Sequence, residues 1–109
     1  MPSCEMSPYG LKALIDQKTA AHRIVDVRSP QAYAEGHIPT AINIPLQELP
    51  GRLAALPRDK TIVTYCGDLA CPLAPKAALA LAQKGFKVME LHGGLEEWTG
   101  VGYPVERKR

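Results

Sequence analysis

The chain has 109 residues, which fits one domain and leaves no room for a second hydrophobic core. Its residues are 46% hydrophobic and 22% charged, which excludes an intrinsically disordered chain. Thirteen Lys and Arg against eleven Asp and Glu give a net charge of +2, too weak to indicate a nucleic-acid partner. No apolar stretch approaches the roughly 20 residues of a membrane span, and no signal peptide is visible, so we expect a cytoplasmic protein without a membrane partner.

The first half of the chain alternates helix and strand signals. A Ser-Pro pair, which places a capping hydroxyl before a proline, begins each of two helices, and runs rich in β-branched residues separate them. The expected elements are a helix over 8–18, a strand over 24–27, a helix over 30–36, a strand over 41–44 and a bent helical segment over 46–56.

The second half continues this alternation. Five β-forming residues at 61–65 follow a Pro-Arg-Asp-Lys turn and make the clearest strand. The expected elements are a strand over 61–65, a helix over 75–84 capped by Gly85, a strand over 86–91 and a last helix from Gly93-Gly94 that contains Trp98. Strands that alternate with helices predict a parallel-sheet α/β domain with helices on both faces.

The three cysteines differ in their surroundings. Three is an odd number, so a complete disulfide framework within the chain is excluded, and we expect a reducing setting in which thiols persist. Cys66 directly follows the strand over 61–65, at the carboxyl edge where open α/β sheets bind ligands. The positive end of the helix that follows and the N–H groups of the loop would both favour the thiolate form of this cysteine. From its position alone, Cys66 could equally be a small buried residue that ends a core strand and has no chemical role.

Short segments in a fixed order carry a resemblance to a known family. The segments are Asp26-Val27-Arg28-Ser29-Pro30, Tyr33, Glu35-Gly36-His37-Ile38, Ala41-Ile42-Asn43-Ile44-Pro45, Tyr65-Cys66, Gly85-Phe86, Leu91-His92-Gly93-Gly94, Trp98 and Gly102-Tyr103-Pro104. Together they resemble the small single-domain form of the rhodanese-like sulfurtransferase family. The resemblance implies a three-layer α/β/α domain around a mainly parallel sheet of about five strands. We expect one domain over 1–109, with a core at about 6–105 and a flexible charged tail at 106–109.

The resemblance also implies a reaction. Cys66 would take a sulfane sulfur from thiosulfate or a persulfide, become a persulfide, and pass the sulfur to cyanide or a thiol. Loop N–H groups would hold the terminal sulfur, so no cofactor and no metal is expected. The expected partners are a small sulfur donor or a persulfidated protein and a thiol acceptor, and the expected state is a monomer.

The predicted active-site and substrate-binding loop departs from the family pattern. It consists of Gly67, Asp68, Leu69, Ala70, Cys71 and Pro72. The family commonly has an arginine and then a serine after the cysteine, whereas the only charge here is Asp68. We therefore expect poor thiosulfate turnover and a preference for a less charged or protein-bound persulfide donor. A cysteine phosphatase of the Cys-x5-Arg type is excluded, because the position that needs the arginine is Pro72.

Cys71 has two interpretations. It can act as a resolving thiol that attacks an oxidised or persulfidated Cys66 and leaves a reversible disulfide, or it can simply pack beneath the helix start. The first interpretation also allows a second functional class, a non-enzymatic or redox-sensing regulatory or binding module that uses Cys66 and Cys71. Cys4 is expected to have no role.

Three further residues are candidates for supporting the site. Asp26 and Arg28 end a strand near the same edge, where a structural ion pair is favoured over catalysis. His92 also lies at a strand end. It could act as a proton donor near the pocket, but we favour the alternative that it is a solvent-exposed histidine in a turn.

Overall fold

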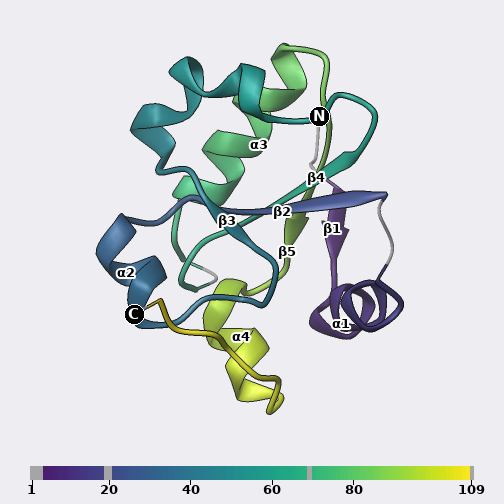
Figure 1. Ribbon diagram of the computed structural model, residues 1–109, viewed down its shortest axis with the longest axis vertical. Coiled ribbons are helices and arrows are strands. Elements are labelled where there is room, and N and C mark those ends of the chain that lie inside the picture. The colour runs from purple at the N-terminus through teal and green to yellow at the C-terminus, as the bar shows by residue number, and fades with distance from the viewer. Residues whose placement is uncertain (1–3, 19–20, 69, 109) are drawn as a thin grey trace.

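The computed structural model describes residues 4–18, 21–68 and 70–108. Its centre is a five-stranded sheet in the order β1-β5-β4-β2-β3, and every pairing in it is parallel (Figure 1). The strands are β1 (Cys4–Met6), β2 (His22–Asp26), β3 (Ile42–Asn43), β4 (Thr61–Tyr65) and β5 (Lys87–Leu91). The predicted α/β class with a parallel sheet of about five strands is confirmed.

Helices connect the strands. The α-helices are α1 (Pro8–Asp16), α2 (Pro30–Glu35), α3 (Leu73–Gln83) and α4 (Gly94–Gly100), and two 3-10 helices are η1 (Leu46–Gly51) and η2 (Leu53–Ala55). Ser7 and Ser29 cap α1 and α2 through their hydroxyl oxygens, each directly before a proline, as the sequence predicts. Among the described residues, no helix combines the length and the apolar character that crossing a membrane requires.

Two hydrophobic layers cover the two faces of the sheet. Successive residues of a strand point to opposite faces, so Ile62 packs in one cluster and Val63 in the other. The first cluster includes Ala77 and Leu81 of α3 and Leu49 of η1, and the second contains residues of α1 and α4. Figure 1 shows α3 and the 3-10 helices on one side of the sheet and α1 and α4 on the other, which gives the expected three layers.

Several element boundaries differ from the predictions. β1 was not predicted, because three residues show no period of their own and the strand is defined by its pairing with β5. The helix expected from 75 begins at Leu73, since a proline is tolerated throughout the first helical turn, where N–H groups lack intrahelical partners. The strand expected over 41–44 is limited to Ile42–Asn43. The helical segment expected over 46–56 is present as two short 3-10 helices, with the break after Gly51.

The C-terminal segment is held against the domain. The backbones of His37 and Glu106 exchange two hydrogen bonds of 2.9 and 2.8 Å, and the Lys108 N–H donates to the Ala34 carbonyl at 3.0 Å. Residues 106 and 108 thus have backbone partners in the domain, Arg109 lies outside the described residues, and the flexibility expected for 106–109 stays a prediction.

Candidate active site

Cys66 lies at the carboxyl end of β4, the central strand of the sheet. It directly follows Tyr65, which ends β4 between β5 and β2. Its side chain is 4% exposed and packs in the same hydrophobic cluster as Ala74 of α3. The structure thus places this cysteine at the edge of the sheet that the sequence indicates.

The start of α4 holds the backbone on either side of the cysteine. The Leu95 N–H donates to the Cys66 carbonyl at 2.9 Å, and the Glu96 N–H donates to the Gly67 carbonyl at 2.8 Å. These N–H groups belong to the first turn of a helix, where no intrahelical acceptor exists for them. The loop therefore receives two hydrogen bonds that fix the position of Cys66 relative to α4.

Gly94 is required for this close approach. A Cβ at this position would lie 2.5 Å from the Cys66 carbonyl oxygen and 3.0 Å from the Asp68 nitrogen, both backbone atoms. Its φ of +62° is also in the left-handed region that favours glycine. From the sequence, Gly93-Gly94 was predicted to begin a helix and was one of the segments that resemble the family, but the contact of Gly94 with Cys66 was not predicted. A glycine pair between a strand and a helix was the signal for a backbone contact.

The start of α3 faces the same region. The Thr64 hydroxyl donates to the Ala74 carbonyl at 3.3 Å, which ties the first turn of α3 to β4. Pro72, the residue before the helix, provides no side-chain cap, and the first turn holds no acidic residue. The positive end of the α3 dipole is therefore not offset by side chains of its own first turn.

Cys66 and Cys71 form a disulfide. Their Cα atoms are 6.3 Å apart, within the usual range of about 4.4–6.8 Å, and the Cys71 N–H donates to the Asp68 carbonyl at 3.3 Å across the intervening turn. Cys71 also packs against the α3-side cluster. The interpretation that Cys71 only packs beneath the helix is therefore wrong, and so is the expectation of free thiols for this pair.

A cavity of about 100 Å³ opens beside the disulfide. Three carboxylate side chains line it, from Glu5 of β1, Asp68 of the loop and Glu90 of β5, and its lining among the described residues includes no Lys, Arg or His. Glu5 and Glu90 are direct neighbours in the register of β1 and β5. The sequence indicated only Asp68, so the site is more acidic than the loop alone predicts.

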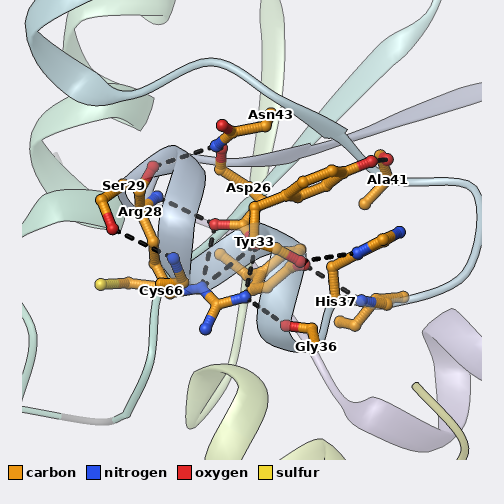
Figure 2. A network of polar contacts seen from close by, with 12 residues as sticks. Asp26, Arg28, Ser29, Tyr33, Gly36, His37, Ala41, Asn43 and Cys66 are labelled. Atoms are coloured by element: carbon orange, nitrogen blue, oxygen red, sulfur yellow. Dashed lines mark hydrogen bonds and ion pairs between the residues drawn. The ribbon is translucent and has the colours of Figure 1, made fainter. Parts of the chain in front are cut away.

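The predicted ion pair of Asp26 and Arg28 is present (Figure 2). The Arg28 guanidinium donates to both carboxylate oxygens of Asp26 at 2.7 to 3.1 Å and to the Gly36 carbonyl at 2.6 Å. Burial lowers the pKa of Arg28, but the hydrogen bonds and charge of Asp26 outweigh it and raise that pKa above its ordinary value. Figure 2 shows the Cys66 sulfur directed away from this network. Arg28 is thus committed to Asp26 and Gly36 and does not replace the missing loop cation.

Tyr65, the residue before the cysteine, carries a neutral phenol that packs in the other hydrophobic cluster, on the opposite face of the sheet from Cys66. Its side chain is fully buried, and its hydroxyl oxygen accepts a hydrogen bond from the Ile38 N–H at 3.1 Å. Burial, followed by the negative charge of Asp26, raises the pKa of Tyr65 far above its ordinary value. Tyr65 therefore stays protonated at neutral pH and has no acid–base role there.

The remaining predicted site residues divide into those of the loop that contains Cys66, and His92, which lies outside the cavity. Gly67, Asp68, Ala70, Cys71 and Pro72 form the connection between β4 and α3, whereas Leu69 lies outside the described residues. The Nδ1 atom of His92 is 3.2 Å from a Glu5 carboxylate oxygen, and His92 is not among the residues that line the cavity. Within the described ranges, no group of three His, Cys, Asp or Glu side chains is placed to hold a metal ion.

Comparisons with known proteins agree with this architecture. A family profile, the rhodanese-like domain, matches residues 7–100. The chain is 35% identical over 83 residues to a sulfurtransferase of Allochromatium vinosum, covering 75% of this chain and 76% of that one. It is also 46% identical over 83 residues to an HTH-type transcriptional regulator of Mycobacterium tuberculosis, covering 76% of this chain but only 37% of the regulator.

A solved structure supports the same assignment. A crystallised protein of Bacillus halodurans is 41% identical and superposes with a TM-score of 0.90, covering 96% of this chain and 77% of that one. The resemblance drawn from the sequence is confirmed, and the chain belongs to the rhodanese-like domain family.

Proposed function

We propose that this protein is a sulfurtransferase that carries sulfane sulfur on Cys66 as a persulfide. The observation that carries the proposal is the position of Cys66 at the end of the central strand, held by α4 beside a cavity at the start of α3. Membership of the family and the named sulfurtransferase relative support the same chemistry.

The reaction has two transfers through one sulfur atom. The Cys66 thiolate attacks the outer sulfur of a donor, the S–S bond of the donor breaks, and the donor thiolate leaves with its electron pair. An acceptor thiolate then attacks the outer sulfur of the Cys66 persulfide and leaves Cys66 as a thiolate. The disulfide with Cys71 must be reduced before the first transfer, because only the free thiolate is a nucleophile.

The acidic residues that line the cavity support one class of sulfur donor over another. Glu5, Asp68 and Glu90 disfavour a dianion such as thiosulfate, because a nearby like charge raises the energy of a bound anion. The donor class is therefore a persulfide, small or protein-bound, and the acceptor is a thiol.

We place this reaction in the cytoplasm, with the protein acting as a monomer.

A transfer assay tests the proposal. Reduced protein is given cysteine persulfide as donor and cyanide as acceptor, and thiocyanate is followed over time. The proposal expects enzyme-dependent thiocyanate that Cys66→Ser abolishes and that Cys4→Ser leaves unchanged. Equal rates for wild type and Cys66→Ser would reject it.

One observation favours a second candidate function. The Cys66–Cys71 disulfide, together with the likeness to part of a transcriptional regulator, suits a redox- or sulfur-sensing module. Such a module would take up sulfur or be oxidised once and would pass no sulfur on. The same assay separates the two, since a sensor that passes no sulfur on gives no thiocyanate that depends on Cys66.

A further inference from the structure

We propose that Cys71 resolves the Cys66 persulfide and expels its outer sulfur as hydrosulfide, so that the protein also reduces sulfane sulfur. The inference rests on the proposed function, because it begins with the persulfide of Cys66. It adds a product, free hydrosulfide, that transfer to an external acceptor does not generate.

The observed disulfide shows that the required approach is available. A Cys71 sulfur that bonds to the Cys66 sulfur in the structure can reach the inner sulfur atom of a Cys66 persulfide, which is the same atom. Cys71 is half-buried, and the turn that carries it is closed by the hydrogen bond between its N–H and the Asp68 carbonyl.

Both ends of the loop are held by hydrogen bonds. The attack of Cys71 on Cys66 is therefore an intramolecular reaction between two groups that are already positioned. The Leu95 N–H holds the Cys66 carbonyl, and the Thr64 hydroxyl holds the Ala74 carbonyl just beyond Cys71. A thiol held in this way acts at a much higher effective concentration than a free thiol in solution. Resolution by Cys71 therefore competes with external acceptors.

The step balances without any group beyond the two cysteines. The Cys71 thiolate attacks the inner sulfur of Cys66–S–SH, a Cys66–Cys71 bond forms, and the bond to the outer sulfur breaks. The outer sulfur leaves as HS⁻ with the electron pair of that bond. The sulfane sulfur is reduced by two electrons, and the two cysteines are oxidised to the disulfide.

The acidic cavity favours this outcome over transfer to an anionic small thiol. The carboxylates of Glu5, Asp68 and Glu90 repel both an incoming thiolate and the departing hydrosulfide ion. Turnover then requires a dithiol, small or protein-borne, that reduces the disulfide and restores both cysteines. The partner class implied by the structure is a dithiol reductant.

A single-turnover experiment tests the inference. Reduced protein carrying Cys4→Ser is freed of reductant under nitrogen and given one equivalent of cysteine persulfide. Hydrosulfide release and intact mass are measured together. The expected result is one hydrosulfide per chain and a mass lower by two hydrogen atoms. In Cys71→Ser the added sulfur atom is expected to remain, with hydrosulfide release at least about tenfold slower.

The controls separate failure of the inference from failure of the proposed function. Cys71→Ala serves as a second variant, and circular dichroism checks the fold of both. Retention of the extra sulfur by wild type, without hydrosulfide release, would overturn the role of Cys71 and leave sulfur transfer intact. Absence of sulfur uptake by the folded Cys71 variants would reject the proposed persulfide, and the inference with it.

Discussion

The carbonyl oxygen of Cys66 occupies the space that a Cβ on Gly94 would need, at a separation of 2.5 Å. This contact joins the β4–α3 loop to the first turn of α4, where the Leu95 N–H donates to the same oxygen. The position of Cys66 therefore depends on a glycine that lies 28 residues further along the chain.

Gly94→Ala is expected to destabilise the fold and to displace the Cys66 loop. The new Cβ meets backbone atoms, and the φ of +62° is strained for alanine, so we expect a loss of about 1–3 kcal/mol in the free energy of unfolding. Urea denaturation measures the loss. Gly100→Ala in the same helix is the control, because no atom lies within 4 Å of its Cβ position, and it is expected to change stability by less than about 0.5 kcal/mol.

Arg28→Lys is expected to weaken the fold while leaving the cysteine chemistry in place. Lysine cannot reproduce the two-pronged contact with buried Asp26 together with the bond to the Gly36 carbonyl, so we expect a loss of about 1–3 kcal/mol. Arg52→Lys is the matched control, since Arg52 is exposed and pairs with Glu48 only at 3.5 Å. A large fall in sulfur uptake by folded Arg28→Lys would show that Arg28 does more than hold the strand end.

Stability is expected to fall at high pH through Tyr65. Burial raises the pKa of Tyr65 in the folded state above its ordinary value of about 10, so the unfolded chain loses this proton first. The stabilisation is complete below that ordinary value and is lost as the pH rises above it. Urea midpoints at about pH 8 and about pH 11 measure the fall, which Tyr65→Phe is expected to reduce. Tyr9→Phe, at an exposed position, is expected to show the same fall as the wild type.

Removal of negative charge beside Cys66 is expected to improve thiosulfate use. Asp68→Asn removes a carboxylate that lines the cavity, and we expect kcat/KM for thiosulfate to rise about threefold to tenfold at low salt. High salt should shrink this gain, because it screens the charge. Asp59→Asn is the control, since Asp59 precedes β4 at the opposite end of the strand from Cys66. An equal gain from both variants would argue against a local electrostatic cause.

The sequence predicted the centre of the fold better than its edges. The strand at 61–65 and the cysteine after it were predictable, because a compact run of β-forming residues ends at Cys66. β1 was not, since an edge strand of three residues depends on its partner strand for its definition. The backbone bridge between His37 and Glu106 was not predictable for the same reason, because it joins residues far apart in the sequence.

The candidate site shows a similar division. Local sequence placed Cys66, Asp68 and Cys71 in one loop, but it could not place Glu5 and Glu90 beside them. Those two carboxylates come together only through the register of β1 against β5. The ion pair of Asp26 and Arg28 was predictable, because both residues lie at one strand end.

The most direct test of the account is the location of the transferred sulfur. Reduced protein is treated with cysteine persulfide, digested without reductant and mapped by mass spectrometry, in Cys71→Ser so that the persulfide is retained. A persulfide on Cys66 predicts one added sulfur atom on the peptide that contains Cys66 and none when Cys66 is also replaced by serine. Sulfur found only on Cys4, or on no cysteine, would contradict it.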